Sequence, residues 1–220
     1  MTRVTDSDLD GKRALNRVLG RNPRIDLYLD LALLVSGLVL IGFLWLHMLF
    51  VATVLLGADA FDRLALALDR YYLAQIGIPF IGVAALVHVL VVSRRIPNRF
   101  QDFWRHATLV RHPDTWTWIF QVVTAPIIAV LALIHVWVVL ADWPIAAVKS
   151  AERIDSFLWF YIILLLVGEY HAGTGLYRQF VKWGWLRRRT IGFILKSITL
   201  LIIILGLGAL WAFLQIGGGA

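Results

Sequence analysis

Five long apolar segments dominate this chain of 220 residues and leave few folds open to it. Each is at least about as long as the ~20 residues that an α-helix needs to cross a bilayer. Their uniform apolarity shows none of the alternation that is typical of a transmembrane β-barrel. The sequence therefore predicts an all-α integral membrane bundle of five transmembrane helices, at 26–56, 72–93, 117–140, 157–181 and 191–216.

The composition agrees with this class and excludes others. A hydrophobic content of 60% with only 16% charged residues lies outside the range of soluble globular domains. Because the chain has no cysteine, disulfides, iron–sulfur clusters and thiolate metal sites within it are excluded. The net charge of +7 could suggest nucleic acid, but the basic residues cluster beside the apolar segments, where they act as topology signals. We expect no nucleic-acid binding.

Charge also predicts the orientation. The loops at 94–116 and 182–190 are rich in arginine, and basic loops of this kind stay in the cytoplasm. We expect two parts, a cytoplasmic basic N-terminal arm at 1–25 and a membrane domain at 26–220. The N-terminus should be cytoplasmic and the C-terminus outside. The arm lacks the short apolar core and cleavage site of a signal peptide.

One histidine falls in each of the first four apolar segments. Ionisable residues are expensive inside a membrane and are usually functional there. Two of these histidines lie in the outer halves of their predicted helices, and two lie in the inner halves. Two pairs at two depths are what two stacked bis-histidine haems require, whereas one zinc or copper site would need a single depth. The outer pair is His47 and His135, and the inner pair is His88 and His171.

Other interpretations of the histidines remain open. Each one alone could be a packing residue that is hydrogen-bonded to a neighbouring helix. A transporter could use the four as a proton relay. His106 and His112 lie in a basic loop, where we expect solvated side chains.

The surroundings of His171 favour a flat ligand. On a helix, Gly168 and Gly175 share the face of His171, so two side chains are missing beside the imidazole. Lys182 returns to the same face about 16 Å further along, where its charge could meet a haem propionate. The alternative is close helix packing through small residues.

Three segments carry a resemblance to a known family. They are LHMLFVATVLLG at 46–57, RHPDTWTWIFQ at 111–121 and GLYRQFVKWGW at 175–185. These segments resemble the dihaem cytochrome b membrane subunit of quinol:fumarate reductases, in the succinate:quinone oxidoreductase superfamily. The resemblance covers about residues 30–216.

The resemblance implies a respiratory role in the inner membrane of a bacterium. The chain would anchor a flavoprotein (FAD) subunit and an iron–sulfur subunit at the cytoplasmic face, and the complex could form a dimer of heterotrimers. The complex would couple menaquinol oxidation to fumarate reduction, or run in reverse, with the carbon chemistry in the flavoprotein. A dihaem cytochrome b of a hydrogenase or formate dehydrogenase, or a haem-free transporter, is the alternative.

Matched residue by residue, the family implies that His88 and His171 ligate a proximal haem b, and that His47 and His135 ligate a distal one. Trp118 and Lys182 match positions that contact haem propionates. Their alternatives are an interfacial tryptophan and a lysine that only sets the topology.

Two acidic residues match functional positions of the family. Glu169 matches a glutamate proposed to carry protons across the membrane; the alternative is a structural acid. The family's menaquinol site uses a glutamate at the position of Asp69, and the shorter aspartate is a departure that could reshape the site. Asp62, seven residues earlier, shares its face if this segment is helical. For both aspartates the alternative is a solvated outer loop.

Overall fold

The computed structural model describes residues 22–94, 108 and 113–218. Residues 1–21 of the predicted arm, His106, His112 and most of the loop at 94–116 lie outside the described residues. All secondary structure in the described part is helical. The elements are α2 (Pro23–Ala52), η1 (Thr53–Leu56), α3 (Ala58–Arg70), α4 (Leu73–Ser93), α6 (Pro113–Ala141), α7 (Ala147–Ser156), α8 (Leu158–Trp183) and α9 (Arg188–Gly217).

The five long helices coincide with the five predicted segments. At the start of α2 the Asn22 side chain accepts a hydrogen bond from the backbone N–H of Arg24 (3.0 Å), and Pro23 takes the first helical position. α8 ends at Gly184, which has a left-handed backbone (φ 67°). Within the described residues α2 with η1, α4, α6 and α9 are long and apolar enough to cross a membrane. α8 is less apolar because it carries Glu169 and His171.

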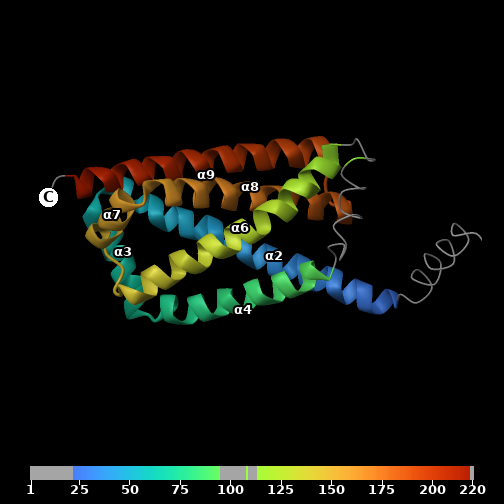
Figure 1. Ribbon diagram of the computed structural model, residues 1–220, viewed down its shortest axis with the longest axis horizontal. Coiled ribbons are helices and arrows are strands. Elements are labelled where there is room, and N and C mark those ends of the chain that lie inside the picture. Colours follow the sequence, from blue (N-terminus) through green and yellow to red (C-terminus); the bar gives the residue numbers. More distant parts are fainter. Residues whose placement is uncertain (1–21, 95–107, 109–112, 219–220) are drawn as a thin grey trace, which may run out of the picture.

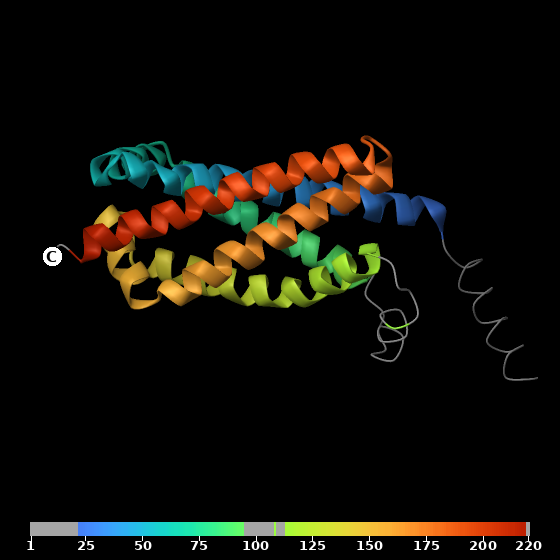
Figure 2. The same ribbon diagram turned by 90° about the horizontal axis from the view of Figure 1, so that it is seen from above.

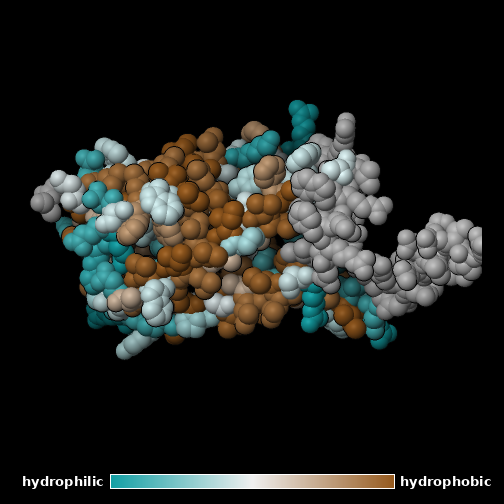
Figure 3. Space-filling model, viewed as in Figure 1, coloured by the Kyte–Doolittle hydropathy of each residue, from teal (hydrophilic) through white to brown (hydrophobic). Residues whose placement is uncertain are grey.

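The long helices contact one another in the order α4, α2, α9, α8, α6, and α2 also contacts α8. In Figure 1 α9 and α4 run along opposite sides of the bundle and α6 crosses obliquely between them, and in Figure 2 α6 lies along one side next to α8. Large apolar side chains are exposed along all five. Figure 3 shows these apolar side chains over the middle of the molecule, with hydrophilic residues toward its ends. A surface of this kind is stable in contact with lipid and not with water.

Two short helices, α3 and α7, replace the loops that the sequence predicts. They lie together at one end of the bundle, which we call the α3–α7 end (Figure 1). There Phe61 and Ala65 of α3, Ala151 and Ile154 of α7 and Phe213 of α9 are buried in one hydrophobic core. A solvated outer loop, the alternative for Asp62 and Asp69, therefore does not describe these segments, because each is an amphipathic helix that buries its apolar face in this core.

Candidate functional site

His47 and His135 form a close pair near the α3–α7 end. His47 lies five residues before the end of α2, and His135 lies six residues before the end of α6. The centres of the two imidazole rings are 6.0 Å apart, with the ring planes at 66°. A metal atom bound to both rings at about 2 Å would give a separation of roughly 6 Å, since each ring centre lies about 1 Å behind its nitrogen. The pair therefore fits a single shared metal atom.

His88 and His171 lie toward the opposite end of the bundle. His88 is five residues before the end of α4, and His171 is twelve residues before the end of α8. The two imidazoles are close enough to interact electrostatically. Nδ1 of His88 is 3.1 Å from the hydroxyl oxygen of Ser36, and Nδ1 of His171 is 3.1 Å from that of Thr124. The structure thus separates the four histidines into the two sets that the sequence predicts.

The described residues hold no group of three or more histidine, aspartate or glutamate side chains that could share a metal ion. α2 presents Gly37 to the inner pair, where an added Cβ atom would lie 3.5 Å from Cε1 of His88. What the chain offers is therefore two separate pairs of imidazoles on four helices, which is the donor set of bis-histidine haem.

The two glycines beside His171 face α6. A Cβ atom at Gly168 would lie 3.4 Å from the side chain of Ile128, and one at Gly175 would lie 2.7 Å from that of Gln121. Side chains of α6 therefore cover the α8 backbone at these glycines, where the sequence suggested open space beside His171. In the structure of this chain, Gly168 and Gly175 therefore serve close packing between α8 and α6, which is the alternative interpretation.

Lys182 forms an ion pair with Asp30, close to the start of α2. Trp118 is half-buried in the second turn of α6. Both residues lie at the end of the bundle to which His88 and His171 are nearer, as the predicted propionate contacts require. Asp30 was not predicted as a site residue, although an acidic residue within an apolar segment is a signal that could have found it.

Glu169 is enclosed between three helices and is only 1% exposed. Its Oε1 atom accepts hydrogen bonds from the indole of Trp45 in α2 (3.3 Å) and from the hydroxyl of Thr199 in α9 (3.1 Å). Its Oε2 atom is buried and has no hydrogen-bond partner among the described residues. Glu169 thus faces α2 and α9, whereas His171 on the same helix contacts α6, which agrees with the opposite faces expected from their spacing.

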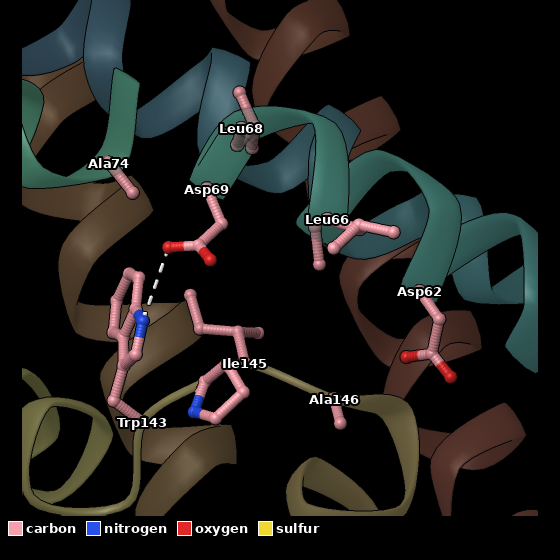
Figure 4. A pocket seen from close by; sticks show the side chains of 10 residues that line it. Asp62, Leu66, Leu68, Asp69, Ala74, Trp143, Ile145 and Ala146 are labelled. Carbon is pink, nitrogen blue, oxygen red and sulfur yellow. Dashed lines mark hydrogen bonds between the residues drawn. The ribbon is translucent and has the colours of Figure 1, made fainter. Parts of the chain in front are cut away.

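A cavity of about 250 Å³ lies at the α3–α7 end, between α3, the start of α4 and the connection from α6 to α7. Asp69 and Asp62 both line it, and so does Trp143 (Figure 4). Oδ1 of Asp69 accepts hydrogen bonds from the Trp143 indole (3.2 Å) and from the Gln75 amide. Both bonds go to one oxygen, so Oδ2 is left to act on a ligand.

Asp62 has a different function in the structure. Its Oδ1 atom accepts a hydrogen bond from the backbone N–H of Ala147 (2.7 Å), the first residue of α7. Ala146, at the helix cap, supplies no side-chain hydrogen bond, so the carboxylate of Asp62 satisfies an N–H that would otherwise lack one. This contact joins α3 to α7. Between the two candidate aspartates, Oδ1 of Asp62 is used by the backbone of α7, whereas Oδ1 of Asp69 is held by a side chain that lines the cavity, that of Trp143.

A cation beside the outer histidine pair was not predicted. The side chain of Arg153 in α7 is only 14% exposed, forms an ion pair with Asp142 (3.0 Å) and acts electrostatically on His135. Its position in the sequence, within a mixed-charge segment, gave no signal of this burial. Trp143 and Gln75 were missed for the same reason, because only the tertiary fold brings them to Asp69.

An all-helical chain with lipid-compatible helices and two buried histidine pairs has the architecture of a membrane cytochrome of the b type. Residues 97–209 match the model of the succinate dehydrogenase/fumarate reductase transmembrane subunit family. The chain belongs to this family and is a transmembrane protein.

Its relatives carry one name. A fumarate reductase cytochrome b subunit from Helicobacter pylori (strain J99) is 30% identical over 206 residues, which cover 86% of this chain and 81% of the relative. The subunit of the same name from Wolinella succinogenes is 30% identical over 163 residues, which cover 68% of this chain and 62% of the relative. The family expected from the three sequence segments is thereby confirmed.

Proposed function

We propose that this chain is the membrane-anchoring cytochrome b subunit of a menaquinol:fumarate reductase, or of the same complex running as a succinate:menaquinone reductase. It would lie in the inner membrane of a bacterium and bind a flavoprotein subunit and an iron–sulfur subunit at the cytoplasmic face. The names of its relatives support this assignment. The observation that carries it is the sorting of four histidines into two pairs near different ends of the bundle.

The four histidines would serve as haem ligands. His47 and His135 would hold a distal haem b near the α3–α7 end, and His88 and His171 would hold a proximal one nearer the iron–sulfur subunit. Each haem would supply one-electron transfer between menaquinol and the partner subunits. Lys182 and Trp118 would contact the propionates of the proximal haem. Lys182 would then have two anionic partners, a propionate and Asp30.

Five helices would span the bilayer in this arrangement. α8 is 26 residues long, about 39 Å at the helical rise, and packs between α9 and α6. Its polar residues Glu169 and His171 face neighbouring helices, so they do not prevent it from crossing lipid. Five crossings would leave the termini on opposite sides, and the arginine-rich loops would put the N-terminus in the cytoplasm and the C-terminus outside.

Menaquinol would be oxidised in the cavity beside Asp69. The lining is mostly apolar, with the Trp143 indole on one side, and this suits a flat apolar ring. Oδ2 of Asp69 would accept a proton from the quinol hydroxyl while His47 and His135 hold the nearby electron acceptor. Asp62 is the weaker candidate because its carboxylate caps α7.

Glu169 would carry protons between the two sides of the membrane. A carboxyl group in an apolar interior is stable when neutral. The Oε2 atom of Glu169, which has no hydrogen-bond partner among the described residues, can bind the proton. Trp45 and Thr199 would hold the other oxygen in place during uptake and release.

The test is a reduced-minus-oxidised absorbance spectrum of the purified complex, with haem measured as pyridine haemochrome against protein. We expect two b haems per chain, with a flavoprotein and an iron–sulfur protein co-purifying. Colourless material, expressed with an adequate supply of haem, would refute the assignment. If two haems are found but a hydrogenase or formate dehydrogenase subunit co-purifies, the proposed partner subunits would be wrong. The roles of the four histidines would stand.

A further inference from the structure

Two hydroxyl groups contact the same atom in each histidine of the inner pair. Ser36 comes from α2 and Thr124 from α6, and each places its oxygen 3.1 Å from Nδ1 of a histidine on another helix, His88 or His171. The same arrangement thus occurs twice, from two unrelated positions in the sequence.

The direction of these hydrogen bonds follows from the other contacts of the hydroxyls. Ser36 Oγ donates to the backbone carbonyl of Leu33 (3.2 Å), and Thr124 Oγ1 donates to that of Phe120 (2.8 Å). A hydroxyl has one hydrogen, and a backbone carbonyl can only accept, so each hydroxyl oxygen is left to accept from the imidazole. If the hydroxyl hydrogen stays on the carbonyl, Nδ1 of both histidines carries the imidazole hydrogen. In a neutral imidazole this leaves the lone pair on Nε2.

We propose that Ser36 and Thr124 are positioning residues for the inner haem ligands, fixing the tautomer and the ring orientation of His88 and His171. This inference rests on the proposed function, in which these histidines hold the proximal haem. A ligand imidazole that donates its second N–H to an oxygen is more basic, and a more basic ligand stabilises ferric over ferrous iron. The two hydroxyls should thus strengthen haem retention and lower the midpoint potential of the inner haem.

The outer pair lacks this arrangement. Nδ1 of His135 is buried and has no hydrogen-bond partner among the described residues. His47 is surrounded by rings, those of Phe43, Phe50 and His135. The hydroxyl effect should be confined to the inner haem, and the outer haem of the same molecule serves as an internal control.

The experiment compares Ser36→Ala and Thr124→Val with two control variants in the full complex. Ser93→Ala and Ser156→Ala remove hydroxyls that bond to the backbone of their own helix, at Leu90 and Glu152. Spectroelectrochemical titration gives both midpoint potentials, and transfer of haem to apomyoglobin gives retention. His171→Ala, which should keep only the outer haem, identifies which potential belongs to which site.

In Ser36→Ala and Thr124→Val we expect the inner potential to shift in the positive direction and haem to be lost from the inner site about ten-fold faster. The outer haem and both controls should remain as in the wild type, and Thr124→Ser should restore the inner potential. Inner potentials and retention equal to those of the controls would overturn the inference. A wild-type complex without haem would overturn the proposed function itself, which is a different result.

Discussion

The imidazole rings of His47 and His135 lie 6.0 Å apart, although the residues come from α2 and α6. Phe43, Phe50 and Tyr161 surround them, and Nδ1 of His135 is buried without a hydrogen-bond partner in the described part of the chain. Leaving a buried polar group unpaired costs about 1–3 kcal/mol. Edge contacts between rings occur at similar distances elsewhere in the chain, as between His135 and Tyr161 at 5.8 Å, so the separation is compatible with one shared metal atom and its test is the loss of haem on substitution.

The first prediction concerns this pair. Replacing either His47 or His135 by alanine should remove the distal haem and leave the proximal one, because bis-histidine iron needs both ligands. Haem quantified as pyridine haemochrome should fall by about half in each variant. Tyr161→Phe is the matched control, since it keeps the ring beside His135 and removes only a hydroxyl. Full haem content in both histidine variants would exclude the pair as a ligand set.

The second prediction tests the cavity. Asp69→Asn keeps the size of the side chain and its hydrogen bonds from Trp143, but it removes the proton acceptor. Menaquinol oxidation should fall by about a hundred-fold, as is usual for the loss of a general base. Fumarate reduction driven by a soluble dye should be unchanged, because it does not need this end of the molecule.

The control for the second prediction is Asp59→Asn, an exposed carboxylate on the same helix. Unchanged menaquinol kinetics in Asp69→Asn would place the site elsewhere. A loss of similar size in Asp59→Asn would indicate a general charge effect.

The third prediction separates Asp62 from Asp69. Asp62→Ala removes the side-chain acceptor at the start of α7, and losses of this kind cost about 1 kcal/mol. In a chain of this size the thermal midpoint of the complex should fall by about 2–4 °C. Menaquinol oxidation should change much less than in Asp69→Asn. Asp155→Ala, which removes an exposed acid near the other end of α7, should leave the midpoint within error.

The long helices could be predicted from the sequence because each apolar segment carries its own signal. α3 and α7 could not, since they are short and polar, and their stability comes from the core that they form with Phe213 of α9. Whether a short amphipathic segment is a helix or a solvated loop depends on an apolar partner that lies far away in the sequence.

The site divides in the same way. The pairing of histidines by depth follows from their positions along the helices and needs no tertiary information. The contacts of Asp69 with Trp143, or of His171 with Thr124, join residues of different helices and depend on how these pack. Gly168 and Gly175 show the reverse case, since local spacing suggested open space and α6 fills it.

The last prediction concerns Glu169, whose Oε1 atom is held by Trp45 and Thr199 while Oε2 has no partner in the described residues. Glu169→Gln keeps an oxygen for both donors and a similar volume, so the haem content and the thermal midpoint should stay close to those of the wild type. It removes the group that can bind and release a proton.

If protons must cross the membrane with the electrons, turnover with menaquinol should fall by more than about ten-fold in Glu169→Gln, while dye-driven fumarate reduction persists. Glu152→Gln, at an exposed position of α7, is the control. Normal menaquinol turnover with both haems present would show that Glu169 is a structural acid. Because Gln keeps an acceptor for both donors to Oε1, a loss of turnover with intact haems and an unchanged thermal midpoint would indicate proton transfer and not a change in the packing of α8 against α2 and α9.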